Sequence, residues 1–267
     1  MKGSTLVHRL FAELSGPAVS TTLTERSILI VPIGAIEHHG PHLPLITDAL
    51  MAEAAATGAV AAGVEAGLDL WQLPTLSVGK SDEHYWAPGT LWLSASTLMS
   101  VLEDVGRSVA TTPANKLVFV NGHGGNVALL QVAVRQLRRM FGLQTFVMPA
   151  MRIAAGSGKD GEPDEFGQGI HGGYGETSAV MHLRPDLVDE SLFARNVPEY
   201  MADFEQIGFN ARPVSFGWIS NDFGPSGVIG DPTGANAEAG KRGFEASVAL
   251  AVEALREIDR FTLPPRP

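Results

Sequence analysis

Several metal-capable side chains stand close together in a loop that follows an apolar run, Ile28 to Ile33. The loop supplies Glu37, His38, His39 and His42, and Asp48 follows where a helix is expected to begin. Carboxylates and imidazoles together suit borderline divalent ions such as zinc or manganese. A polar surface connection between a strand and a helix is the alternative for this stretch taken alone. We interpret it as a metal site.

A further histidine stands in a glycine-rich turn. Residues 121–126 are Asn-Gly-His-Gly-Gly-Asn and follow the apolar run 116–120 at once. Glycines allow close backbone approach, so the turn could instead bind an anion at a helix N-terminus. It does not match Gly-x-Gly-x-x-Gly, and an anion loop leaves His123 unexplained. We therefore expect His123 to bind a metal.

A third stretch, residues 171–178, is His-Gly-Gly-Tyr-Gly-Glu-Thr-Ser. His171 is expected in a loop and Glu176 in the first turn of the next helix. Their spacing does not place them on one helical face, but a turn at the glycines can bring them together. The alternative for Glu176 is a carboxylate favoured only by the helix dipole. His182 is expected to pack outside the site.

The elements that position these residues alternate between strand and helix. This pattern predicts a single α/β domain over residues 1–267, with a mostly parallel sheet covered by helices on both faces. Thr47 or Asp48 is expected to cap the first long helix, and Ser94 or Ser96 the next. Ligand sites of open α/β sheets form beyond the carboxyl ends of the strands, so Glu37, His39 and His123 should converge there. The expected strands are 27–33, 68–73, 116–120 and 144–148, and the expected helices are 47–66, 94–111, 127–140, 176–183 and 236–261.

Two long connections should complete the site. A loop as long as 74–92 is more often functional than idle. We expect Asp82 and Glu83 to line the pocket rather than face solvent. The glycine-rich loop 152–175 is expected to be mobile and to close over substrate. The side chains expected to contact substrate are His84, Tyr85, Trp86 and Tyr174.

Composition excludes several classes of protein. The formal net charge of -10 argues against binding to nucleic acid or to an anionic membrane. The chain has no cysteine, which excludes disulfides, thiolate metal sites and cysteine nucleophiles. No signal peptide or membrane span is predicted. A cytoplasmic protein fits these features.

Three spaced motifs resemble the creatininase (creatinine amidohydrolase) family. They are Glu37-His-His39-Gly-Pro-His-Leu-Pro-Leu-x-Thr-Asp48, Asn-Gly-His123-Gly-Gly-Asn and His171-x4-Glu176-Thr-Ser. Pro88-Gly89-Thr90 and Gly230-Asp231-Pro232 are also similar to that family's pattern. The resemblance extends from about residue 25 to about residue 260.

The resemblance implies a three-layer αβα fold and two divalent ions per chain, zinc and/or manganese. Carboxylate and imidazole ligands would also accept iron. Glu37 and His123 would bind one ion, His39 the other, and Asp48 would bridge the two. His171 matches the family's proton-transferring histidine. A small-molecule substrate and a homohexamer are also implied.

Two departures from that pattern bear on the substrate. Gly125 stands where creatininase has a glutamate that binds the second metal, and Glu176 is our candidate replacement, with a role in catalysis as well. The chain also has no tryptophan between Trp92 and Trp218, where creatininase uses tryptophans to cover creatinine. Creatinine is therefore not the expected substrate.

The expected activity is metal-dependent hydrolysis of a non-peptide amide bond, cyclic or linear. One alternative is a peptidase that trims a small modified peptide, as in mycofactocin maturation. A formamide-type deformylase and a hydrolase of a cyclitol-derived ketone are further alternatives. A metal-free small-molecule binding protein is the alternative from another class, but a binder has no need for this spacing of ligands.

Overall fold

One parallel sheet of four strands organises the molecule. The computed structural model describes residues 9–152, 155–159, 161–209 and 212–263. The strands lie in the order β2-β1-β3-β4, and each neighbouring pair is parallel. Their bounds are β1 Ile28–Ile33, β2 Leu70–Gln72, β3 Lys116–Asn121 and β4 Gln144–Pro149. The predicted parallel sheet is confirmed.

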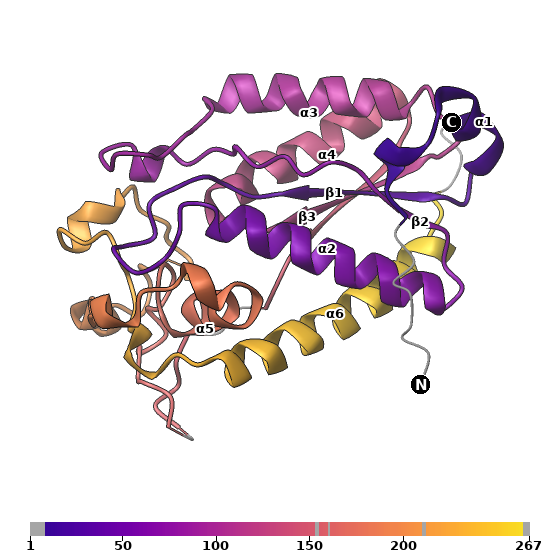
Figure 1. Ribbon diagram of the computed structural model, residues 1–267. Helices are drawn as coiled ribbons and strands as arrows, with labels where there is room; N and C mark the ends of the chain where they lie inside the picture. The colour runs from indigo at the N-terminus through magenta and orange to yellow at the C-terminus, as the bar shows by residue number, and fades with distance from the viewer. Residues whose placement is uncertain (1–8, 153–154, 160, 210–211, 264–267) are drawn as a thin grey trace, which may run out of the picture.

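Helices cover both faces of this sheet, which gives three layers (Figure 1). Helices α3 (Ala95–Val109) and α4 (Val127–Phe141) pack on one face, and α2 (Thr47–Glu65) and α6 (Ala237–Arg260) pack on the other. The shorter α5 (Tyr174–Leu183) contacts α6 and α2, and α1 (Gly16–Thr22) packs near the other end of the sheet. The predicted αβα architecture is therefore confirmed.

Alternate residues of the central strands point into two separate cores, because successive side chains of a strand face opposite sides of the sheet. Leu29, Val31 and Phe119 pack with leucines of α3 and α4. Ile28 and Ile30 face the other side and pack against α2. The contact face of α2 is made of small side chains, so this helix lies close to the sheet; they are Ala52, Ala55, Ala56 and Ala59.

Two local expectations need correction. Neither Thr47 nor Asp48 caps α2, because the helix begins at Thr47 and the N-cap position is Ile46, which makes no side-chain cap. The second strand is shorter than expected, since only residues 70–72 pair with β1. The cap of α3 is as expected, with Ser94 Oγ accepting a hydrogen bond from Thr97 N at 3.2 Å.

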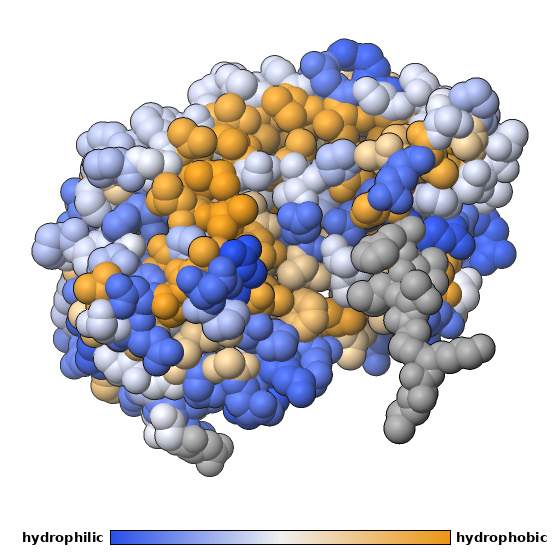
Figure 2. All heavy atoms as spheres, viewed as in Figure 1, coloured by the Kyte–Doolittle hydropathy of each residue, from blue (hydrophilic) through white to orange (hydrophobic). Residues whose placement is uncertain are grey.

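Apolar side chains are also visible on the surface. Figure 2 shows a band of apolar side chains across the upper part of the molecule, in the region where Figure 1 draws α3 and α4. Within the described ranges, no helix combines the length and the apolar character needed to cross a lipid bilayer.

Candidate metal centre

The candidate site lies just beyond the carboxyl ends of β1 and β3. Ile33 and Asn121, the last residues of these strands, are paired in the parallel register. Glu37 and His39 follow β1 within a few residues, and His123 follows β3. The expected convergence is therefore found in the structure, and it follows from the strand register.

Two glycines bring Asp48 to the same place. A Cβ at Gly34 would overlap the backbone of Asp48 and Ala49, and a Cβ at Gly122 would overlap the carbonyl oxygen of Asp48. The first turn of α2 therefore packs directly against the ends of β1 and β3. This close approach places the Asp48 carboxylate between the two histidine-bearing loops.

The Asp48 carboxylate contacts both ligand histidines. Its Oδ1 lies 3.2 Å from His39 Nε2, and its Oδ2 lies 2.9 Å from His123 Nδ1. All three side chains are at most 5% exposed. A carboxylate with one oxygen toward each histidine is suited to bridge two ions.

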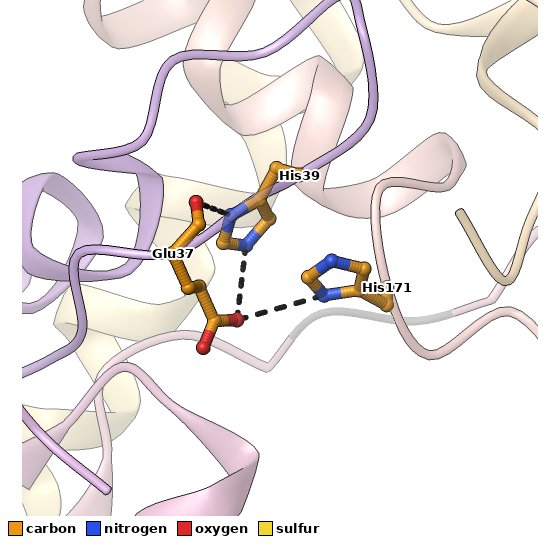
Figure 3. Close-up of side chains that lie close together, drawn as sticks. All are labelled: Glu37, His39 and His171. Atoms are coloured by element: carbon orange, nitrogen blue, oxygen red, sulfur yellow. Dashed lines mark hydrogen bonds and ion pairs between the residues drawn. The ribbon is translucent and has the colours of Figure 1, made fainter. Parts of the chain in front are cut away.

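Several imidazoles surround the Glu37 carboxylate. Its Oε1 lies 3.7 Å from His39 Nε2 and 3.7 Å from His171 Nδ1, and Figure 3 shows both rings approaching this oxygen. His84 Nε2 is 3.6 Å from the same atom. The other oxygen, Oε2, lies 3.3 Å from His123 Nδ1 and accepts a hydrogen bond from Ser81 Oγ.

Glu176 also reaches the site. One carboxylate oxygen lies within 4.8 Å of ligand atoms of His39 and Asp48, which together form a possible ion-binding group. The Glu176 carboxylate also accepts a hydrogen bond from Gly172 N at 2.6 Å. The turn at the glycines therefore brings Glu176 back toward the loop of His171, as the sequence suggested.

Burial and neighbouring charges shift the pKa values of these groups. Burial raises the pKa of Glu37 to about 8 and that of Glu176 to about 7. Burial lowers the pKa of His39, but the nearby Asp48 outweighs it and raises the value to about 10. For Asp48, burial is outweighed by His39 and His123, which hold its pKa well below the usual range.

The residues present fit divalent ions. Asp48 Oδ2 is buried and accepts no hydrogen bond, although His123 Nδ1 lies beside it. An orphaned carboxylate oxygen this deeply buried is costly unless a cation or proton compensates it. The surrounding donors are carboxylates and imidazoles, which suit zinc and manganese.

His171 is oriented toward the centre from the opposite loop. Its Nε2 lies 2.7 Å from the backbone oxygen of His38, which leaves Nδ1 facing Glu37. Its ring lies between those of His39 and His84, with ring centroids 4.3 and 4.2 Å away. Burial, followed by the charges of His39 and His84, lowers the pKa of His171 well below its usual range. A neutral ring with a free Nδ1 can accept and return a proton.

Not all of the residues expected to contact substrate lie at the metal centre. His84 is buried in the centre, and Tyr85 is 55% exposed beside it. Trp86 packs edge-on against His38 and donates from Nε1 to Ser220 Oγ. Tyr174 lines a separate cavity with Glu162 and Arg242, so the structure does not bring it to the metal centre, and its contact with substrate stays a prediction.

The two acidic residues Asp82 and Glu83 lie in different surroundings. The Glu83 side chain is only 15% exposed and lies 3.4 Å from His123 Nε2. Asp82 is 54% exposed and pairs with Lys80, so its expected position in the pocket is wrong. His182 packs against Phe244 outside the site, as expected.

Sequence reasoning missed several supporting contacts. Ser81 holds Glu37, and Asn126 accepts a hydrogen bond from Lys80 N while donating to Gly34 O. The signal for Asn126 was its place at the end of the glycine-rich motif, but its partners are distant in sequence. His42 Nε2 lies 3.1 Å from Thr177 Oγ1, the residue after Glu176.

The glycine-rich loop expected to be mobile has an anchor in its described part. Glu165 is fully buried, and its carboxylate accepts hydrogen bonds from the backbone N–H groups of Gly156, Tyr174 and Asp231. This anchor fixes the start of α5 and therefore the loop that carries His171. The expected closure of residues 152–175 over substrate stays a prediction.

The fold and the site define a metal-dependent hydrolase that acts on carbon–nitrogen bonds. A family model described as creatinine amidohydrolase matches residues 12–255, and the chain belongs to the creatininase family. The chain is 38% identical to the mycofactocin precursor peptide peptidase of Mycobacterium ulcerans, over 82% of this chain and 81% of that one. It is 34% identical to the creatinine amidohydrolase of Pseudomonas putida, over 61% and 66%.

Solved structures agree with this assignment. A mutant creatininase described as "Zn-Zn type" is 25% identical, with a TM-score of 0.69, and the match covers 95% of this chain and 99% of that one.

Proposed function

We propose that this protein is a two-metal amidohydrolase that cleaves an amide bond in a small modified peptide. The observation that carries the proposal is the convergence of buried carboxylates and imidazoles around Asp48, with His171 facing them. The metal ligands we assign are Glu37, His39, Asp48, His123 and Glu176.

These residues would hold two ions in different surroundings. Glu37 and His123 would serve one ion, His39 and Glu176 the other, and Asp48 would bridge them. When bound, a pair of divalent ions activates water near neutral pH and polarises a carbonyl oxygen. Zinc and manganese both suit such donors, and iron is a further candidate.

His171 supplies the proton transfer that amide hydrolysis needs. Its Nε2–H is held by the backbone oxygen of His38, so Nδ1 is the atom that receives a proton. The same atom can then protonate the leaving nitrogen, which must gain a proton as the amide bond breaks. Glu176 lies close enough to the centre to assist this transfer.

A peptide substrate is supported by two observations. The relative from M. ulcerans is named as a peptide peptidase and matches most of both chains. Exposed apolar side chains also lie beside the backbone that carries Glu37. Leu91 forms an antiparallel β-bridge with Ile36, and the backbone oxygen of Leu45 accepts a hydrogen bond from Glu37 N. Leu91 is 54% exposed, which offers contact area to a ligand larger than creatinine. These features favour the peptidase over the non-peptide amidohydrolase.

A substrate panel tests the proposal. The protein is loaded with zinc or manganese and incubated with short peptides, creatinine and N-formyl compounds, and products are identified by mass spectrometry. We expect peptide cleavage that stops with a chelator and returns with metal. Hydrolysis of creatinine or formyl compounds with no peptide cleavage would refute the substrate class.

The homohexamer and the cytoplasmic location stay predictions. So does a single domain over residues 1–267.

A further inference from the structure

We propose that Glu83 is a positioning residue that holds His123 with Nδ1 directed at the metal centre. The inference rests on the proposed function, because it concerns an ion that His123 would bind. Nothing in the motif pattern assigns Glu83 this role.

The nitrogens of His123 face opposite sides. Nδ1 lies 2.9 Å from Asp48 Oδ2 and 3.3 Å from Glu37 Oε2. Nε2 lies 2.9 Å from the backbone oxygen of Lys80 and 3.4 Å from Glu83 Oε1. With the proton on Nε2, the ring donates toward Lys80 and Glu83 and presents the Nδ1 lone pair to the centre. A carbonyl or carboxylate on the outer nitrogen is how metal-binding histidines are usually oriented.

Gly125 leaves room for the Glu83 carboxylate beside His123 Nε2. A Cβ at residue 125 would overlap Glu83 Oε1, His123 Nε2 and Lys80 O. A side chain at 125 and the present position of the 80–84 segment therefore exclude each other. The chain has a glycine at 125, and the freed space is occupied by Glu83.

The turn that carries Glu83 is fixed from several sides. Asn126 Oδ1 accepts a hydrogen bond from Lys80 N at 2.9 Å, and Ser220 Oγ donates to Glu83 O at 3.3 Å. Within this turn, Asp82 points to solvent while Glu83 points to His123. The inward position of Glu83 is thus imposed by its surroundings.

A direct ligand role is the competing assignment, since Glu83, Glu37 and His123 offer ligand atoms within 4.8 Å of one another. The orientation of His123 argues against it. Glu83 is beside Nε2, whereas the carboxylates of the centre are beside Nδ1. An ion on Nδ1 would lie on the far side of the ring from Glu83.

Zinc titration of metal-free protein against a competing chelator tests the proposal. We expect Glu83→Ala to weaken one of two binding events about 10- to 100-fold, the usual effect of removing such a partner. Glu83→Gln should weaken it less, because its amide oxygen still accepts from Nε2–H. Asp82→Asn is the matched control and should bind as the wild type does. All four proteins should hold two ions at saturation.

Three outcomes would overturn the proposal. Unchanged affinity in both Glu83 variants would remove the positioning role. Saturation at one ion in Glu83→Ala and Glu83→Gln would make Glu83 a direct ligand instead. Wild-type protein that binds no zinc would refute the proposed function itself, and that result is distinct from the first two. Thermal unfolding of each metal-free variant checks that the fold is intact.

Discussion

The Nε2 atom of His171 lies 2.7 Å from the backbone oxygen of His38, the residue between the candidate ligands Glu37 and His39. This contact joins the loop after β1 to the loop before α5. It also fixes the tautomer of His171, because a carbonyl oxygen only accepts. The free Nδ1 therefore faces Glu37 at 3.7 Å.

His171→Asn should lower kcat by roughly 10²- to 10⁴-fold, the usual contribution of a general acid or base. Metal content should not change, since His171 is assigned to proton transfer. Steady-state kinetics and elemental analysis on the same samples check both expectations. His182→Asn, outside the site, is the control. Loss of an ion from His171→Asn would make the residue a ligand and contradict the assignment.

Glu176→Gln should reduce the occupancy of one ion and leave the other bound. The amide oxygen can still accept the hydrogen bond from Gly172 N, so the start of α5 should keep its structure. Elemental analysis together with circular dichroism checks this. Full occupancy of both sites would mean that Glu176 serves only the helix start.

Metal binding should release protons and become tighter as pH rises. The pKa of Glu176 is raised to about 7 and that of Glu37 to about 8, so in metal-free protein both hold protons below these values. Ligands must lose those protons to bind an ion. The ligand His39 also holds a proton, since its pKa is raised to about 10, so affinity should increase from about pH 6 and continue to increase above about pH 8. Calorimetry in buffers of different ionisation enthalpy counts the protons, and a count of zero at pH 7 would disprove this expectation.

His42 should make the fold sensitive to acid. Burial lowers its pKa to about 4, whereas the unfolded chain takes up this proton near pH 6.5. Its contribution to stability is thus present above about pH 6.5 and is lost as pH falls toward about 4. The Tm of metal-free wild type should fall more between pH 7 and pH 5 than that of His42→Asn. His182→Asn is the control. Equal slopes for wild type and His42→Asn would exclude this role.

Sequence alone predicted the parts of the site that lie at strand ends. Apolar runs located β1 and β3, and the parallel sheet then required Glu37, His39 and His123 to meet. Asp48 was assigned through the family resemblance, and the close approach at Gly34 and Gly122 gives its physical reason.

The rest depends on contacts between distant segments, which one chain's pattern does not encode. Tyr174 lies in a separate cavity, and its helix α5 is positioned by contacts with α6, which is distant in sequence. Glu83 was expected to line the pocket, but its contact with His123 depends on the space left beside Gly125, which sequence does not show. The anchor at Glu165 has no local motif, since its three donors come from three segments.

The most direct test of the two-metal centre is elemental analysis of wild type and Asp48→Asn, both purified without chelator or added metal. We predict about two divalent ions per wild-type chain, as a two-metal site requires. Asp48→Asn should lose both together, because one carboxylate bridges them. A wild-type chain without ions and without tight rebinding of zinc or manganese would contradict the account, as would loss of a single ion in Asp48→Asn.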